Sequence, residues 1–306
     1  MSFVLRTHDL CKRYKNHLVL DHVNMNVEQG DIYGFVGENG SGKTTIIRLI
    51  TGLIFANGGS LELFGVADHD PAIREARRKV GAIVESPSIY LNMSATDNLR
   101  MQCGILGISD EEKVRQTLET VGLAELYGSK KHAGDFSLGM RQRLGIAMAL
   151  LGDPEFIILD EPMNGLDPAG IVSIRELILD LNRRGITFLI SSHILTELSL
   201  IATKYGIISK GRLVQEISAE ALGNTCSHTT FINTENKDAL PALLADLPNA
   251  TAITPTDYGV RIEGDVDLNE ALGRVIGAGL RILSVNTHKT GIEDYYLSLI
   301  GGGRHA

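Results

Sequence analysis

Apolar residues follow a strand-like spacing in the first part of the chain. Alternation over residues 3–10 and 18–27, with a polar turn at Lys15 and Asn16 between them, predicts antiparallel strands. Farther along, four short runs are apolar at nearly every position, which is typical of parallel strands covered by helices on both faces. These runs occupy residues 32–36, 80–84, 156–159 and 186–190. The pattern predicts an α/β fold with a parallel sheet core and an antiparallel β subdomain.

Helical spacing dominates between residues 94 and 151. Ser94 followed by Asp97 is a capping-box pattern that predicts the start of a helix, and further helical runs cover residues 110–118 and 138–151. A helical subdomain at about residues 94–151 is therefore expected as an insertion between two strands of the sheet.

The pattern changes again after about residue 215. Strands are expected at residues 228–233, 250–256, 258–263 and 280–286, and helices at residues 238–247 and 268–278. A closing helix is expected after the last strand. The order β-α-β-β-α-β is that of a small α+β, ferredoxin-like domain. With 306 residues, the chain has the length of about two domains, which we place at residues 1–215 and 216–306.

Composition narrows the class of protein. Hydrophobic residues make up 43% and charged residues 22%, as in ordinary globular chains. The formal charge of −8 argues against a surface that coats nucleic acid, so no nucleic-acid partner is expected. Three cysteines, Cys11, Cys103 and Cys226, lie far apart and in no metal-ligand spacing. A reduced cytosolic compartment without disulfides or a zinc site is expected, with all three cysteines as small buried side chains.

No run approaches the roughly 18 apolar residues that a membrane-spanning helix needs. The beginning of the chain also lacks the charged and apolar regions of a secretory leader. We therefore expect a cytoplasmic protein, whose role at a membrane, if it has one, depends on a partner.

A phosphate-binding loop follows the run at residues 32–36. Residues 37–44 fit the pattern G-x4-G-K-[ST] between a predicted strand and a predicted helix. Backbone N–H groups of such a loop and the helix N-terminus bind phosphate oxygens, the lysine reaches the β- and γ-phosphates, and the hydroxyl binds Mg²⁺. The expected binding residues are Gly37, Asn39, Gly40, Ser41, Gly42, Lys43, Thr44 and Thr45. The alternative, a glycine-rich turn without function, is disfavoured by the strand–helix context.

Two adjacent carboxylates end the run at residues 156–159. Asp160 and Glu161 lie where a parallel sheet binds its ligands, at the carboxyl end of a strand. We expect Asp160 to hold Mg²⁺ or its waters and Glu161 to act as the general base that activates water. Alone, this pair could be a solvated strand terminus, but the phosphate-binding loop favours the catalytic interpretation.

With these two elements and the stretch at residues 136–143 between them, the chain resembles the ATP-binding cassette (ABC) ATPases over about residues 1–215. The stretch is similar to the family signature L-S-G-G-Q, although Phe136, Leu138 and Met140 depart from it. In the family, the residues matched by Ser137 and Gly139 face the γ-phosphate bound to the other protomer. The resemblance thus implies ATP, Mg²⁺ and a second copy of the chain as partners.

Three further positions resemble family motifs that occur in the same order along the chain. The stretch at residues 164–167 resembles the D-loop, which implies that Asp167 lies at the dimer contact. His193 resembles the switch histidine that contacts the γ-phosphate, and Tyr14 stands where the family places an aromatic ring against adenine. A structural histidine and an ordinary surface or core tyrosine are the alternatives.

Glu85 stands where most members of the family have glutamine. A carboxylate also binds Mg²⁺, but it adds negative charge beside Asp160 and Glu161. Together with the Ser-Leu-Gly-Met signature, it resembles the subgroup that exports bacitracin or lantibiotic peptides for self-protection.

The resemblance implies the ATP-hydrolysing subunit of a peptide-antibiotic exporter, bound through a separate membrane permease to the inner face of the cell membrane. Transport of another substrate remains open. A non-transport ABC ATPase is a second possibility, but neither the long coiled coil of repair proteins nor the second cassette of ribosomal ones is present in the sequence. A nucleotide-binding switch is a third. The Asn-Lys-x-Asp element of a GTPase is missing, since the similar string 236–239 ends in alanine.

Overall fold

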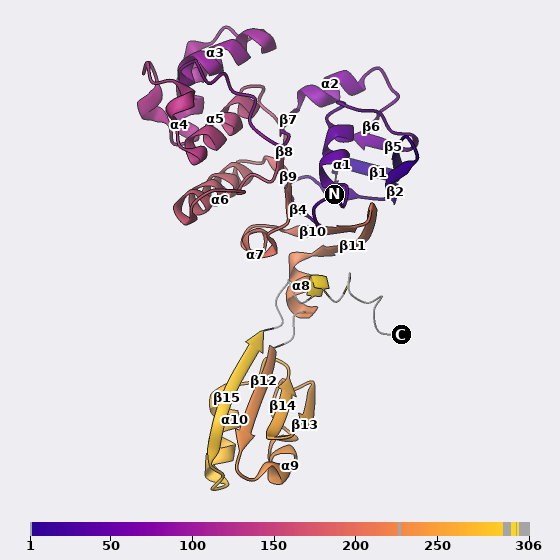
Figure 1. The fold of residues 1–306 in the computed structure, drawn as a ribbon, viewed down its shortest axis with the longest axis vertical. Coiled ribbons are helices and arrows are strands. Elements are labelled where there is room, and N and C mark those ends of the chain that lie inside the picture. Colours follow the sequence, from indigo (N-terminus) through magenta and orange to yellow (C-terminus); the bar gives the residue numbers. More distant parts are fainter. Residues whose placement is uncertain (1, 226–227, 290–294, 298, 300–306) are drawn as a thin grey trace. The chain divides into compact units, whose positions relative to one another are not determined.

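The computed structural model describes residues 2–225, 228–289, 295–297 and 299. The chain divides into two compact units, Met1–Ala219 and Glu220–Ala306 (Figure 1). The boundary expected near residue 215 falls within strand β11 (Arg212–Ser218). Of the expected closing helix, only a helical stretch at 295–297 lies within the described residues.

An antiparallel sheet opens the first unit, with the strand order β2-β1-β5-β6 and β3 paired to β1. Its strands are β1 (Phe3–Tyr14), β2 (His17–Val23), β3 (Asn26–Glu28), β5 (Gly58–Leu63) and β6 (Val66–Ala67). The single strand predicted over residues 18–27 is thus two strands. Asn24 separates them because its side chain oxygen accepts a hydrogen bond from the backbone N–H of Asp9 (2.8 Å).

The second sheet of this unit has the order β11-β10-β4-β9-β8-β7. Its members, besides β11, are β4 (Ile32–Val36), β7 (Val80–Ile83), β8 (Phe156–Asp160), β9 (Thr187–Ser192) and β10 (Lys204–Ser209). All neighbours are parallel except β10 and β11. The predicted parallel core is confirmed, whereas β10 was not predicted. The carboxyl ends of five parallel strands, β4, β7, β8, β9 and β10, therefore meet at one edge.

Helices surround this sheet (Figure 1). Those connected directly to it are α1 (Lys43–Ile50), α2 (Ile73–Arg78), α6 (Pro168–Arg183) and α7 (Leu195–Leu198). The helical subdomain contains α3 (Ala95–Leu106), α4 (Glu111–Thr120) and α5 (Leu138–Leu150), with short 3-10 turns at Ala124–Leu126 and Ala133–Asp135. The expected cap of α3 is present, because Ser94 Oγ accepts a hydrogen bond from the Asp97 N–H (3.1 Å).

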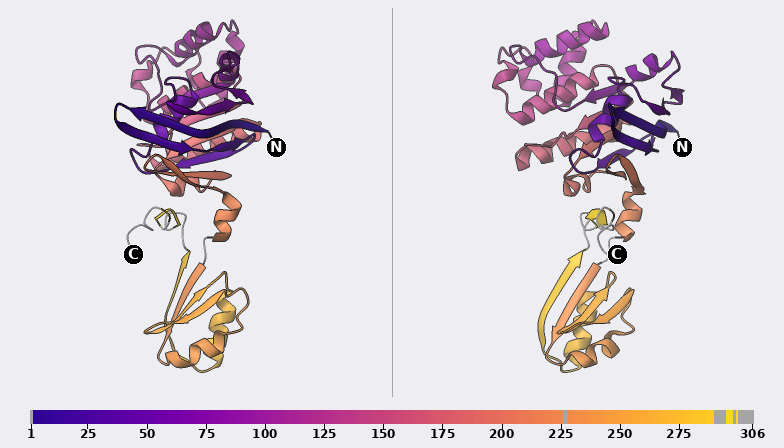
Figure 2. Two further views of the ribbon diagram at one scale, coloured as in Figure 1. Left: turned by 90° about the vertical axis from the view of Figure 1, so that its right-hand side faces the viewer. Right: turned by 45° about the vertical axis from the view of Figure 1, so that its right-hand side comes forward.

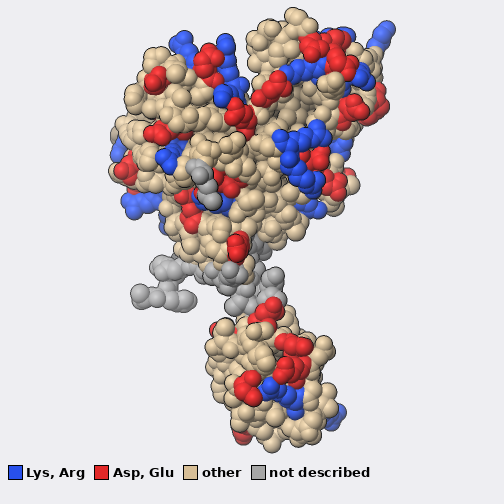
Figure 3. Space-filling model, turned by 180° about the vertical axis from the view of Figure 1, so that it is seen from behind, with Lys and Arg blue, Asp and Glu red and all other residues tan. Residues whose placement is uncertain are grey.

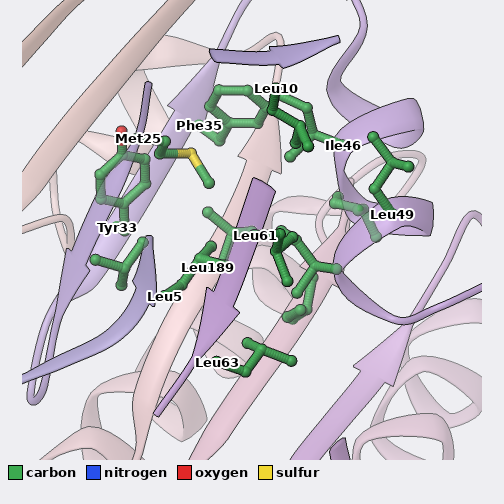
Figure 4. Close-up of a cluster of buried hydrophobic side chains, with 14 of the residues drawn as sticks. Leu5, Leu10, Met25, Tyr33, Phe35, Ile46, Leu49, Leu61, Leu63 and Leu189 are labelled. Atoms are coloured by element: carbon green, nitrogen blue, oxygen red, sulfur yellow. The ribbon is translucent and has the colours of Figure 1, made fainter. Parts of the chain in front are cut away.

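A hydrophobic core joins the antiparallel sheet, α1 and the parallel sheet (Figure 4). Leu10 and Leu61 contribute from the antiparallel sheet, Ile46 from α1, and Phe35 and Leu189 from the parallel sheet. Each such side chain stabilises the fold by about 1.5–3 kcal/mol relative to exposure. This packing holds α1, and with it the loop that precedes it, in a defined place at the sheet edge.

The second unit is an antiparallel four-stranded sheet with two helices on one face (Figure 2). Its elements are α8 (Ala219–Thr225), β12 (His228–Thr234), a 3-10 turn (Lys237–Ala239), α9 (Leu240–Leu244), β13 (Ala252–Pro255), β14 (Gly259–Glu263), α10 (Leu268–Gly277) and β15 (Ile282–Lys289). The strand order is β13-β14-β12-β15, and from β12 on the element order is the expected β-α-β-β-α-β. Helix α9 is shorter than predicted. It starts next to Pro241, which fits only the first turn of a helix.

Candidate active site

The loop between β4 and α1 takes a shape that requires glycine. Gly40 and Gly42 have φ angles of 81° and 113°, which other residues rarely adopt. At Gly37, a Cβ atom would lie only 2.4 Å from the backbone oxygen of Ile208. The loop therefore curls tightly and presents its backbone to the start of α1, as a phosphate-binding loop must.

Lys43 extends across this loop. Its Nζ donates hydrogen bonds to the backbone oxygens of Gly37 (2.6 Å) and Glu38 (3.3 Å), and it lies 3.6 Å from Glu161 Oε1. The side chain is buried, so its charge is poorly screened and is held in place by these carbonyl groups. A buried, positioned ammonium group is suited to binding an anion at the loop.

A cavity of about 250 Å³ opens beside the loop. It is lined by Val19, Asn39, Gly40, Gly42, Lys43, Thr44, Thr45 and Glu161. Apart from Val19, all of these were predicted from the sequence. Val19 comes from strand β2 and was missed because a valine in a hairpin belongs to no motif. Ser41 contributes a buried hydroxyl that has no hydrogen-bond partner within the described residues, which leaves a polar atom for a ligand.

Asp160 lies at the end of β8 with only 2% of its surface exposed. Its Oδ2 accepts a hydrogen bond from the Thr44 hydroxyl (2.9 Å), and its Oδ1 accepts one from the Ser191 hydroxyl. A carboxylate and a hydroxyl oxygen thus meet at the start of α1. Oxygen atoms of these two kinds are the ligands that Mg²⁺ prefers, so the donor set fits this ion.

Glu161 connects the loop to β9. Its Oε2 lies 2.8 Å from Nδ1 of His193, while its Oε1 faces Lys43. Its backbone N–H donates to both the oxygen and the hydroxyl of Ser191 (3.1 Å each), and its φ angle is 51°. A glutamate held in the left-handed region costs about 1–3 kcal/mol, a strain found at functional sites. The structure therefore gathers Lys43, Glu161 and His193, although they are far apart in the sequence.

Ser137 and Asp167 cap two helices outside this cavity. Ser137 Oγ accepts from the Met140 N–H at the start of α5 (3.3 Å), and Asp167 accepts from the Gly170 N–H at the start of α6 (2.9 Å). A Cβ on Gly165 would lie 3.3 Å from Leu138, so the two helix starts are close neighbours. Ser137, Gly139 and Asp167 are not among the described residues that line the cavity at the loop.

Tyr14 and Glu85 are also not among the described residues that line the cavity at the loop. Tyr14 ends β1, is 42% exposed, and has the Lys12 ammonium 5.0 Å from its ring centroid. Glu85 follows β7 with a φ of 65°, and its carboxylate pairs with Arg48 of α1 (2.5 Å) while remaining 61% exposed. The structure thus gives Glu85 a cationic partner, and its binding of Mg²⁺ stays a prediction.

The parallel sheet, the glycine-shaped loop and the carboxylates beside it define a P-loop nucleoside triphosphatase. The family model described as ABC transporter matches residues 20–164. The bacitracin transport ATP-binding protein BcrA of Bacillus licheniformis is 41% identical, and the match covers 99% of both chains. BcrA of Enterococcus faecalis is 36% identical over 99% of this chain and 98% of its own.

A shorter relative matches mainly the first unit. The lantibiotic transport ATP-binding protein SrtF of Streptococcus pyogenes is 41% identical over 70% of this chain and 90% of its own. Among solved structures, MJ1267 in its ADP conformation, an ATP-binding cassette of an ABC transporter, is 27% identical. It superposes with a TM-score of 0.66 over 73% of this chain and 94% of its own. The chain belongs to the family of ABC transporter ATP-binding proteins, and it is an ATPase.

Proposed function

We propose that this chain is the ATP-hydrolysing subunit of an exporter that protects the cell against a peptide antibiotic of the bacitracin or lantibiotic type. The observation that carries this proposal is the extent of the similarity. The bacitracin relatives match both units of the chain, whereas the lantibiotic relative spans only 70% of it. The C-terminal unit is thus shared with proteins named for bacitracin transport, which favours a bacitracin-like substrate.

The geometry of the site supports the following proposed catalytic roles. The loop amides and Lys43 hold the phosphates of ATP, and Thr44 and Asp160 hold Mg²⁺, which neutralises charge on the phosphate oxygens when bound. Glu161 accepts a proton from the attacking water. His193, 2.8 Å from Glu161, orients that carboxylate and approaches the γ-phosphate. Tyr14 and Glu85 are proposed to bind adenine and Mg²⁺, respectively.

A second copy of the chain completes the site. Ser137 and Gly139 start helix α5, whose N-terminus is an anion site, but they do not line the cavity beside their own loop among the described residues. We propose that they bind the γ-phosphate held by the other copy, with Asp167 at the contact between copies. ATP then favours the closed dimer, and hydrolysis reopens it.

A separate membrane permease is the second partner. None of the described helices is long and apolar enough to cross a bilayer. A cavity of about 220 Å³ lies between β7 and helices α3 and α5, and its lining includes Val84 and Ser86, the two neighbours of Glu85 in the chain. The exposed side chains of Tyr90, Leu91 and Leu106 add apolar surface on the same segments. We propose that the permease binds here, which places the chain on the cytoplasmic face of the membrane.

Charge distribution supports a protein partner rather than nucleic acid. On the face drawn in Figure 3, basic and acidic side chains are interspersed in small groups. A nucleic-acid-binding surface instead concentrates positive charge in one patch or stripe. Co-purification with a membrane protein is expected; co-purification with ribosomes or DNA would contradict the proposal.

The test is Glu161→Gln. It should lower ATP hydrolysis at least about a hundredfold, because general-base catalysis contributes about 10²–10⁴ in rate, while ATP binding is retained and dimers accumulate. Glu155→Gln, at the other end of β8, is the matched control and should hydrolyse ATP normally. Undiminished hydrolysis by Glu161→Gln would show that the base has been misassigned.

Substrate is tested in the native cell. Replacing the chromosomal gene by the Glu161→Gln variant should lower the concentration of bacitracin that stops growth. Resistance to unrelated antibiotics should be unchanged. Equal sensitivity to bacitracin and lantibiotics in both strains would rule out the peptide-antibiotic assignment while leaving the ATPase assignment intact.

A further inference from the structure

A β-bulge in the first sheet brings three chemically reactive side chains together. In the β1–β2 ladder, Leu10 pairs with Val23 and Lys12 pairs with Leu20, with a register shift between them. A single residue of β1, Cys11, therefore lies opposite two residues of β2, Asp21 and His22. His22 has a φ of 51°, in the left-handed region, so the bulge is held in a strained conformation.

The potential ligand atoms of these residues are clustered. One atom each from Cys11, Asp21 and His22 lies within 4.8 Å of the others. His22 Nδ1 is 2.8 Å from Asp21 Oδ1, and the His22 backbone N–H donates to Cys11 Sγ (3.3 Å). Tetrahedral Zn²⁺ with bonds of about 2.0–2.3 Å places its ligand atoms about 3.3–3.8 Å apart. Small side-chain rotations are therefore enough to surround an ion.

The surroundings hold the cluster in position. Cys11 is fixed from the other side, where its backbone oxygen accepts a hydrogen bond from the Asn57 N–H (2.9 Å). Arg212 binds Asp21 only through Oδ2 (Nε 2.6 Å, Nη2 2.5 Å), which leaves Oδ1 directed to His22.

We propose that Cys11, Asp21 and His22 form a binding site for Zn²⁺, with water completing the coordination. Thiolate, imidazole and carboxylate are the protein ligands of this ion. The metal lies between Nδ1 of His22 and Oδ1 of Asp21 and replaces their hydrogen bond. Because 69% of the His22 side chain is exposed, the ion enters directly from solvent.

The proposed site differs from the expectation, drawn from the cysteine spacing, of a chain without a zinc site. Residues 11, 21 and 22 match no metal-binding spacing in the sequence. They come together because the bulge places Cys11 opposite both Asp21 and His22. Cys103 is buried, as expected, and Cys226 lies outside the described residues, but Cys11 is half-buried beside two other ligands. The site does not depend on the proposed transport function.

Cobalt gives a direct readout. The purified, metal-free full-length protein is titrated with Co²⁺, which should produce a thiolate-to-cobalt charge-transfer band that Zn²⁺ abolishes by competition. Cys11→Ser should remove the band, and His22→Gln should weaken Co²⁺ binding at least about tenfold. Cys103→Ser, Cys226→Ser and His8→Gln, the last on the same strand β1, are matched controls that should retain it.

A band that survives Cys11→Ser, or a wild-type protein without any band, would overturn the site. Thermal unfolding without metal checks the fold of each variant. If Cys11→Ser does not fold, the two histidine variants test the site. His22→Gln should bind Co²⁺ more weakly, whereas His8→Gln should keep the band unchanged. Loss of the band in both histidine variants would also contradict the proposal, because it would show a general effect rather than coordination.

Discussion

The two units of this protein use β-sheets in different ways. In the first unit, parallel strands end at a common edge, and their register pairs Val36 with Ser192 and Asp160 with Ser191. The residues that follow these strand ends are the phosphate-binding loop, Glu161 and His193. In the C-terminal unit every neighbouring strand runs in the opposite direction, so the residues after each strand are divided between two edges. Parallel packing thus collects distant residues into a site, and antiparallel packing does not.

The units also differ in what they bury. The first unit buries Lys43 and Asp160, which are charged and costly to remove from water unless they are paired. Among the described residues of the C-terminal unit, the buried polar side chains are threonines: Thr229, Thr230 and Thr234. Because burying a charge is costly, the buried charges of the first unit indicate that they serve its chemistry.

Lys43→Ala tests this difference most strongly. Removing a buried charge that we propose to bind the phosphates should weaken ATP binding by about 3 kcal/mol or more, which is more than a hundredfold in Kd. Lys237→Ala, in the C-terminal unit, should leave the Kd unchanged, since Lys237 donates to the backbone oxygen of Asp257 in its own unit. Fluorescent-nucleotide titration measures both. Equal affinities for the two variants would mean that the buried charge does not serve nucleotide binding.

Two truncations should locate the border between the units. A chain ending at Ala219 should bind ATP with unchanged affinity, because all of β11 is kept. One ending at Gln215 loses Glu216, which accepts a hydrogen bond from the Tyr33 hydroxyl (2.8 Å). Burial is the main cause that raises the pKa of Tyr33 well above 10, and the negative charge of Glu216 is the second. This hydroxyl therefore stays neutral. Without Glu216 the buried Tyr33 hydroxyl is unpaired, which should lower the free energy of unfolding by about 1–3 kcal/mol.

Denaturant unfolding of the two truncated chains measures the difference. Equal stability would show that the cassette ends before Glu216. Weaker ATP binding by the chain that ends at Ala219 would show that the C-terminal unit takes part in nucleotide binding.

Paired helix caps provide the finest comparison. Ser137 caps α5 in the first unit, and Asp267 caps α10 in the second by accepting from the Asn269 and Glu270 N–H groups. Each change to alanine should cost about 1 kcal/mol in the free energy of unfolding. Only Ser137→Ala should also slow ATP hydrolysis, because we propose that its hydroxyl binds the γ-phosphate held by the second copy. Steady-state hydrolysis at saturating ATP measures this, and equal rates for both variants would remove Ser137 from the site.

Much of the site could be predicted because its motifs are local. A strand, a glycine-rich loop and a helix that begins with Lys43 are adjacent in the sequence, so their chemistry can be recognised before folding. Val19 could not be predicted as part of the site, because it comes from a hairpin that contains no motif. The ion pair of Glu85 with Arg48 was also missed, since it joins residues from different elements.

Periodicity was sufficient for the fold class: an α/β unit with a helical insertion and a small α+β unit. The local motifs added the phosphate-binding loop, and the resemblance that they carry implied the cassette. Short-range spacing determines strand, loop and helix because each depends on a few neighbouring residues. Contacts between distant residues were settled by tertiary structure alone. Glu161 meets His193 because β8 and β9 are parallel and in register, and Cys11 meets two ligands because the β1–β2 ladder contains a bulge. Strand register and its irregularities arise from packing of the whole sheet, which no local pattern records.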